Sequence, residues 1–238
     1  MKQIAILGVS YFGSAVLEEL LEMDVDILVI DKDREVLDRY RDAVSAAIGM
    51  DVINWDALEK TLPKTMDAVI IDMGKNIESS ILAASYCRKL GIKTIIAKAE
   101  TEAHGEILGI VGATKVVFPN REAAKRIVPQ IVSNLVLNYL PVGGNLVIAE
   151  VEIPESFVGK TVLELDLRKK YGLNLISVRS EQEEYRLFSP DYRFEAHDIA
   201  LVSGTEADID SFAGRLEKEG SSKTFMESIK QLFSKTKA

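Results

Sequence analysis

Short apolar runs recur along the first half of the chain, and each of them stops abruptly. Five such runs lie at residues 4–7, 27–30, 68–71, 94–97 and 115–118. Strands that are apolar on both faces are typical of a parallel sheet that helices cover on both sides. Between the runs, over 15–21 and 77–90, apolar residues recur at helical spacing. This alternation predicts an α/β fold built on a Rossmann-like, doubly wound parallel sheet.

The pattern changes near residue 140. Residues 122–140 carry apolar side chains at helical spacing and predict one more helix, which Pro129 either kinks or begins. The segment 141–145, Pro-Val-Gly-Gly-Asn, then breaks the chain. Beyond it we predict strands over 146–153, 174–179, 185–188 and 198–202, and helices within 159–170 and over 207–217. We therefore predict a first domain over 1–140 and a second, smaller α+β domain over 141–219.

The end of the chain, residues 220–238, has a different character. From Ser221 onward it carries four lysines and one glutamate in a protein of net charge −8. Five apolar residues fall on one helical face, namely Phe225, Met226, Ile229, Leu232 and Phe233. We predict a basic amphipathic helix that docks on the protein or on a dimer mate. Contact with a membrane surface or with a membrane partner is the alternative.

Composition and charge narrow the class of protein. At 47% hydrophobic and 28% charged residues the chain has an ordinary globular composition. Its acidic balance argues against nucleic-acid binding, which needs a basic surface. A single cysteine excludes an internal disulfide, and two scattered histidines argue against a metal site. The sequence shows no secretory signal and no run of about 18 apolar residues, so we expect a cytoplasmic protein.

The first turn carries the clearest chemical motif. Gly8-Val9-Ser10-Tyr11-Phe12-Gly13 follows the first predicted strand and opens a helix, which is the context of a dinucleotide fingerprint. Gly8 suits the tight turn and Gly13 suits close packing of helix on strand. The helix N-terminus offers N–H groups and a positive dipole end to phosphate. Ser10 replaces the glycine that lets the backbone approach a pyrophosphate closely.

An acidic residue stands where the fingerprint needs one. Asp31 ends the second predicted strand, where its carboxylate can accept both ribose hydroxyls and repel a 2′-phosphate. Ligands of open α/β sheets bind at the carboxyl ends of the strands, which adds residues that follow the later strands. The predicted nucleotide site comprises Gly8, Ser10, Tyr11, Phe12, Gly13, Asp31, Lys32, Asp51, Val52, Gly74, Asn76, Lys98 and Glu100. Lys98 is interpreted either as a phosphate contact or as a surface lysine.

The sequence assembles no catalytic set. His104 lies at a predicted helix start, where a capping or surface role is expected, and His197 is expected in a loop. The second domain is too small to hold a substrate against a nicotinamide. We therefore predict a protein that is not an enzyme. The alternatives are a small NAD-dependent dehydrogenase and a ligand-sensing regulator of another transporter or of transcription.

Longer motifs resemble a known family. Residues 8–14, 74–82, 97–99 and 110–119 resemble the N-terminal RCK domain, also called KTN or TrkA-N. Residues 158–175 resemble the C-terminal RCK domain, or TrkA-C. The resemblance runs in order over residues 1 to 217. It is most specific for the KtrA/KtrC-type and CabP-like potassium-uptake regulators of Gram-positive bacteria.

The resemblance implies a cytosolic gating subunit. Such subunits form homodimers that assemble into an octameric ring on a KtrB/TrkH-like membrane potassium channel subunit, and ATP and ADP favour different ring shapes. In some members cyclic di-AMP binds between two C-terminal domains and shuts down uptake. The positions that match that pocket are Val162, Leu167, Arg168, Asn174 and Pro190. The segment 122–140 is the expected hinge and dimer element.

Two positions depart from the ATP-sensing pattern of the family. Tyr11 stands where an arginine is common, and Asn120 stands where a glutamate helps to hold a cation near the phosphates. A γ-phosphate then lacks a charged partner, and hydrogen bonds to charged groups are the strong ones. We therefore predict weak discrimination between ATP and ADP, or a preference for ADP, AMP or NAD(H).

Overall fold

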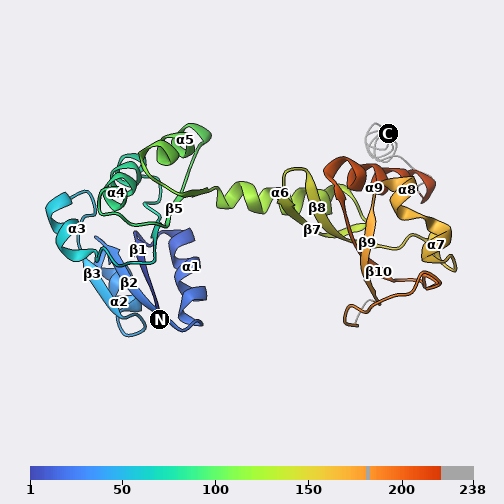
Figure 1. Ribbon diagram of the computed structural model, residues 1–238, viewed down its shortest axis with the longest axis horizontal. Helices are drawn as coiled ribbons and strands as arrows, with labels where there is room; N and C mark the ends of the chain where they lie inside the picture. The colour runs from blue at the N-terminus through green and yellow to red at the C-terminus, as the bar shows by residue number, and fades with distance from the viewer. Residues whose placement is uncertain (181–182, 221–238) are drawn as a thin grey trace, which may run out of the picture. The chain divides into compact units, whose positions relative to one another are not determined.

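The computed structural model describes residues 1–180 and 183–220 and divides the chain into two compact units. The first unit spans Met1–Asn120 and the second begins at Arg121. Each has its own sheet and its own core (Figure 1). The domain boundary at residue 140 stays a prediction, and the predicted basic tail lies outside the described residues.

The first unit is built on a six-stranded parallel sheet. Its strands are β1 (Lys2–Leu7), β2 (Val25–Asp31), β3 (Ala46–Gly49), β4 (Ala68–Ile71), β5 (Ile95–Lys98) and β6 (Lys115–Val117). The spatial order is β3-β2-β1-β4-β5-β6, and all five pairings are parallel. The order reverses between β1 and β4, which is the point where ligands of such sheets bind. The predicted doubly wound sheet is confirmed.

Helices cover both faces of this sheet. They are α1 (Tyr11–Leu21), α2 (Arg34–Tyr40), α3 (Trp55–Thr61), α4 (Ile77–Lys89) and α5 (Glu102–Val111). Helices α1 and α2 pack on one face, and α3, α4 and α5 contribute to the core on the other. Cys87 of α4 is fully buried there, and burial raises the pKa of its thiol to about 12. A thiol in this environment is unreactive.

The helix N-termini differ in a way that matters for ligand binding. Helices α2, α3, α4 and α5 begin with a side-chain cap from Asp33, Asn54, Asn76 and Thr101, respectively. Ser10 occupies the cap position of α1, yet its side chain makes no capping hydrogen bond. The first N–H groups of a helix have no partner within the helix. The start of α1 therefore differs from the other four.

The second unit contains a four-stranded antiparallel sheet. Its strands β7 (Val136–Gly143), β8 (Leu146–Glu152), β9 (Asn174–Arg179) and β10 (Ile199–Thr205) lie in the order β7-β8-β10-β9. The other elements are α6 (Pro119–Val132), a 3₁₀ turn (Glu155–Phe157), α7 (Val162–Leu165), α8 (Leu167–Tyr171) and α9 (Glu206–Gly220). Phe157, Tyr171 and Phe212 pack ring against ring in the core. The predicted smaller α+β domain is thus present.

The single helix predicted over 122–140 is wrong. Helix α6 passes through Pro129 and ends at Val132, and the following residues form β7. Val136 and Tyr139 of β7 are buried in the core of the second unit, where they pack as part of its sheet. Of the predicted breaker at 141–145, residues 141–143 belong to β7, and Gly144 (φ +59°) and Asn145 form the hairpin turn to β8.

Two further predictions in the second unit need correction. Residues 185–188 do not form a strand; of these four residues only Arg186 makes an isolated bridge, to Val178. The segment meets β9 through Arg186, which exchanges two backbone hydrogen bonds with Val178, whereas Leu187 is 95% exposed. The helix predicted within 159–170 is two short helices, because Asp166 between them adopts a left-handed conformation (φ +42°).

Within the described residues, no helix is both long enough and apolar enough to cross a membrane.

Candidate functional site

A cavity of about 250 Å³ opens at the carboxyl ends of the central strands of the first unit. The loops after β1, β2, β3 and β4 surround it. Its lining residues are Gly8, Val9, Ser10, Ile30, Asp31, Lys32, Asp33, Val36, Met50, Asp51, Val52, Asp72, Met73, Gly74, Asn76 and Ser79. The cavity is therefore lined by both apolar side chains and carboxylates, as in sites that hold a small polar ligand.

The turn from β1 into α1 requires glycine at two positions, Gly8 in the loop and Gly13 in the first turn of α1. Gly8 has φ +79°, and a Cβ atom there would lie 2.3 Å from the carbonyl oxygen of Asp72. At Gly13 a Cβ would lie 2.8 Å from the carbonyl oxygen of Gly8. These contacts are too short for any larger residue without backbone movement. The two glycines hold α1 tightly against the ends of β1 and β4.

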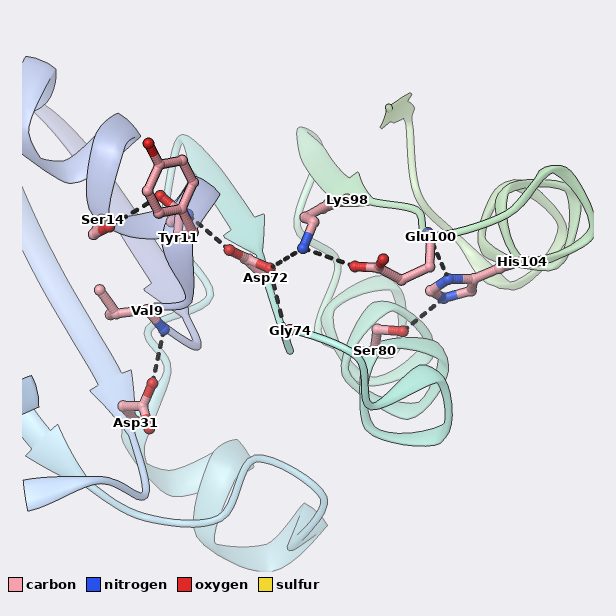
Figure 2. A network of polar contacts seen from close by, with 11 residues as sticks. Val9, Tyr11, Ser14, Asp31, Asp72, Gly74, Ser80, Lys98, Glu100 and His104 are labelled. Carbon is pink, nitrogen blue, oxygen red and sulfur yellow. Dashed lines mark hydrogen bonds and ion pairs between the residues drawn. The ribbon is translucent and has the colours of Figure 1, made fainter. Parts of the chain in front are cut away.

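Asp31 fixes the shape of this loop. Its Oδ2 accepts a hydrogen bond from the N–H of Val9 at 2.7 Å, and its Oδ1 accepts one from Asp33 at 2.9 Å. Figure 2 shows the carboxylate directed at the loop from the end of β2. Each carboxylate oxygen keeps a second acceptor position. The residue predicted to bind ribose can therefore position the loop between β1 and α1 and still accept hydroxyl hydrogens.

Asp72 is a central site residue that the sequence reasoning missed. It follows β4 and is 1% exposed. Its Oδ2 accepts a hydrogen bond from Gly13 at 2.8 Å, and its Oδ1 accepts one from Gly74 at 3.2 Å. The carboxylate thus ties the start of α1 to the loop after β4 (Figure 2). Its position directly after a predicted strand, two residues before the predicted Gly74, was the available signal.

Lys98 is neither a surface lysine nor part of the cavity lining. Its Nζ lies 3.2 Å from Oδ1 of Asp72 and 2.7 Å from Oε1 of Glu100. Partial burial acts to lower the pKa of Lys98, but the hydrogen bond to Glu100 and the charge of Asp72 outweigh it and raise the pKa. One ammonium thus serves two carboxylates, and it is charged at neutral pH.

His104 does not have the surface role expected from the sequence. It is 3% exposed, and its Nε2 lies 2.7 Å from Oγ of Ser80 on α4. Its Nδ1 accepts a hydrogen bond from the N–H of Glu100 at 3.2 Å, which places the ring proton on Nε2. Burial lowers the pKa of His104; the charge of Glu100 opposes this shift and that of Lys98 adds to it. The histidine is a neutral link between α5 and α4.

The predicted nucleotide-site residues fall into two groups. Eight of them line the cavity, namely Gly8, Ser10, Asp31, Lys32, Asp51, Val52, Gly74 and Asn76. The other five, Tyr11, Phe12, Gly13, Lys98 and Glu100, lie outside its lining. Tyr11 is 91% exposed, and Gly13 contacts Asp72 behind the loop. The polar network in Figure 2 connects both groups.

The five positions matched to a cyclic di-AMP pocket lie around α7, α8 and β9. Val162 begins α7, Leu167 and Arg168 begin α8, and Asn174 begins β9. The carbonyl of Pro190 accepts a hydrogen bond from the N–H of Leu163, next to Val162. Arg168, Asn174 and Pro190 are exposed, whereas Leu167 is 5% exposed and belongs to the core.

A second hollow of about 680 Å³ lies within the second unit, against α6, β7 and α9. Its walls are mainly apolar and include Val128, Val132 and Val136. Tyr139 also lines this hollow. Its burial raises the pKa of its hydroxyl to about 12, and the charge of Glu206 and a hydrogen bond to Glu206 add to that shift. In the part of the chain that the structure describes, no three His, Cys, Asp or Glu residues are grouped to hold a metal ion.

Comparison with known proteins places these features in a family. Residues 4–119 match the TrkA-N domain, and residues 146–216 match the TrkA-C domain. Ktr system potassium uptake protein C of Bacillus subtilis is 33% identical over 217 residues, which are 90% of this chain and 97% of that protein. Ktr system potassium uptake protein A of the same organism is 25% identical and covers 92% of this chain and 97% of that protein.

Among solved structures, the GsuK RCK domain has the same fold. It superimposes with a TM-score of 0.62 at 19% identity, over 90% of this chain and 47% of that chain. The two domain matches and the extended likeness to protein C agree with the two units seen in the structure. This chain therefore belongs to the RCK family of paired TrkA-N and TrkA-C domain proteins, which includes the Ktr system potassium uptake proteins.

Proposed function

We propose that this protein is the cytosolic, nucleotide-binding regulatory subunit of a Ktr/Trk-type potassium uptake system. The observation that carries the proposal is the cavity at the switch point of the sheet. There, the start of α1, whose own cap residue Ser10 makes no capping hydrogen bond, lies beside the carboxylate of Asp31. The relatives named as Ktr potassium uptake proteins span nearly the whole chain, which supports a regulatory rather than a catalytic role.

The proposed ligand is an adenine nucleotide, either ATP/ADP or NAD(H). Val36, Met50 and Val52 form an apolar wall beside Asp31, which suits an adenine ring next to a ribose. The phosphates would lie toward the start of α1, where helix N–H groups and the helix dipole favour anions. A GsuK channel of the same fold, solved bound to NAD, overlays this chain with a TM-score of 0.58 at 19% identity.

The proposed mechanism is a shift between conformations. A ligand changes a gate only if it binds one conformation more tightly than another. Nucleotide in the first unit supplies one such bias. Cyclic di-AMP at Val162, Leu167, Arg168, Asn174 and Pro190 of the second unit supplies a second, inhibitory one in this proposal. The exposed guanidinium of Arg168 is suited to a phosphate of that ligand.

The proposed assembly is a homodimer that builds an octameric ring on a KtrB/TrkH-like membrane channel subunit. Helix α6 supports the dimer, because none of its described residues is buried. Ile127, Val128, Ile131 and Val132 of α6 are between 51% and 75% exposed. Exposed apolar side chains that gather on one helix mark an interaction surface. In this proposal the cover is a second copy of the chain.

Growth at limiting potassium tests the function. A strain that lacks potassium uptake would receive the membrane subunit with the wild-type protein or with Asp31→Ala. We expect wild type to restore growth and Asp31→Ala to restore less, because the nucleotide site is damaged. Equal growth with no regulatory subunit, with wild type and with the variant would contradict the proposal. Hydride transfer by the purified protein would favour a dehydrogenase instead.

A further inference from the structure

The carboxylate of Asp72 lies at the N-terminal end of α1, within the lining of the cavity. Its Oδ2 accepts a hydrogen bond from Gly13, in the first turn of α1, at 2.8 Å. The side chain is 0% exposed, so water does not screen its charge. The favourable interaction that a helix N-terminus gives an anion is thus partly used by the protein's own anion.

The surroundings offset this charge only in part. Asp72 shares its only described ammonium partner, Lys98, with Glu100, which is the closer of the two carboxylates. The cavity lining itself holds four carboxylates, those of Asp31, Asp33, Asp51 and Asp72, and the single ammonium of Lys32. The charged side chains of the lining therefore give the cavity a net negative charge, and Asp72 is the carboxylate among them that bonds to α1.

Nucleotides differ mainly in how much negative charge they bring to such a field. AMP carries about two negative charges at neutral pH and ATP about four, because each phosphate is ionised. A nearby unscreened carboxylate repels them in proportion to that charge. It also removes one N–H, that of Gly13, from those available to phosphate oxygens.

We propose that Asp72 is the residue that sets nucleotide specificity in this protein, by selecting against phosphate charge at the start of α1. This inference rests on the proposed nucleotide-binding function. It adds that the site discriminates between nucleotides by their phosphate charge. The site prefers adenine ligands with few phosphate charges, such as AMP or a dinucleotide, over ATP. This selection by the charge of Asp72 does not depend on the side chains at positions 11 and 120.

The test is calorimetric titration of AMP, ADP and ATP, in the absence of divalent cations, into wild type and two variants. Asp72→Asn keeps an acceptor for Gly13 and removes the charge, and Asp72→Ala also frees the Gly13 N–H. Asp33→Asn is the matched control: it removes one carboxylate from the same lining and keeps a good cap for α2. Trp55, the only tryptophan, lies in the first unit and reports whether each variant is folded.

We expect the affinity for ATP relative to AMP to rise at least about tenfold in either Asp72 variant, a difference of about 1.4 kcal/mol. The control should change that ratio much less. If folded wild type and Asp72 variants bind nucleotides with the same ratio, the Asp72 inference is wrong and the proposed function stands. If neither wild type nor any folded variant binds a nucleotide, both are wrong. A ratio that rises equally in Asp33→Asn overturns the inference, because general charge then explains the effect.

Discussion

The carboxylate of Asp31 accepts a hydrogen bond from the N–H of Val9, 22 residues earlier, at 2.7 Å. This contact joins the end of β2 to the loop between β1 and α1. One side chain thus shapes the phosphate-binding loop and presents acceptor positions to a ribose. Recognition of the sugar and the geometry of the phosphate site are therefore coupled in the proposed nucleotide complex.

Replacement of Asp31 by alanine should damage both properties. The variant loses a charged acceptor for Val9 and Asp33, and a hydrogen bond of this kind contributes about 1.5–3 kcal/mol. We expect adenine nucleotide affinity to fall at least tenfold by calorimetry. Asp31→Asn, which retains one oxygen acceptor, should lose less. If Asp31→Ala binds nucleotide as wild type does, the carboxylate is not part of the site.

Two glycines with similar φ angles allow the cost of the left-handed backbone to be measured apart from the cost of steric crowding. Gly8 (φ +79°) has the Asp72 carbonyl oxygen 2.3 Å from a built Cβ, whereas Gly91 (φ +84°) has nothing within 4 Å. Gly91→Ala should cost about 1 kcal/mol, the ordinary penalty of the left-handed region. Gly8→Ala should cost about 2–3 kcal/mol more, because the backbone must move. Urea unfolding followed at Trp55 measures the difference, and equal costs would contradict the close approach.

Lys98 should be essential to the stability of the first unit because of its partner. Lys98→Met leaves the buried carboxylate of Asp72 without its cation and should cost about 3 kcal/mol. Asp72→Asn together with Lys98→Met should recover most of that loss, since no uncompensated buried charge remains. The double-mutant cycle by urea unfolding gives the coupling directly. Additive effects would mean that the ion pair is not formed.

The neutral state of His104 predicts a pH dependence of stability. Its Nδ1 accepts the N–H of Glu100, so a second ring proton would face a donor. Its pKa is lowered in the folded protein, so the unfolded chain binds the proton first as pH falls. His104 therefore contributes stability above its ordinary pKa near 6.5, and that contribution is lost progressively as pH falls below it.

The measurement is thermal unfolding of wild type and His104→Gln between pH 5 and pH 8. The difference in melting temperature between the two proteins should shrink as the pH falls. His197→Gln is the control, because its side chain is 72% exposed and makes only a long contact with Glu152. A difference between wild type and His104→Gln that stays constant with pH would show that the histidine does not titrate in this way.

The sequence was informative where a property depends on neighbours along the chain. The apolar runs predicted the parallel sheet, and the glycine motif with Asp31 at the end of the second strand predicted one side of the cavity. Asp72 escaped prediction because its partner Gly13 lies 59 residues earlier, and only the adjacency of β1 and β4 brings them together. His104 escaped for the same reason, since Ser80 lies on another helix.

The helical spacing of apolar residues alone led to the wrong interpretation of residues 122–140. Apolar residues continue past Val132 at spacings that a helix tolerates, yet Val136 and Tyr139 are buried in the core as part of β7. The pairing of β7 with β8 decides the conformation of residues 136–143, and the local sequence preference does not predict that pairing. The same applies to 185–188, where only Arg186 pairs with the sheet, at Val178 of β9, so these β-prone residues do not form a strand.

The exposed face of α6 leads to a prediction about assembly. Ile131 is 74% exposed, so replacing it by aspartate should leave the fold of the protomer intact. If a second copy covers this face, the new charge would be buried in the dimer and should weaken association at least tenfold. Sedimentation analysis over a range of concentrations measures this. Met23→Asp is the matched control, because Met23 is 61% exposed and lies after α1. If both variants associate as wild type does, α6 is not the dimer element; if both dissociate equally, the effect is not specific to α6.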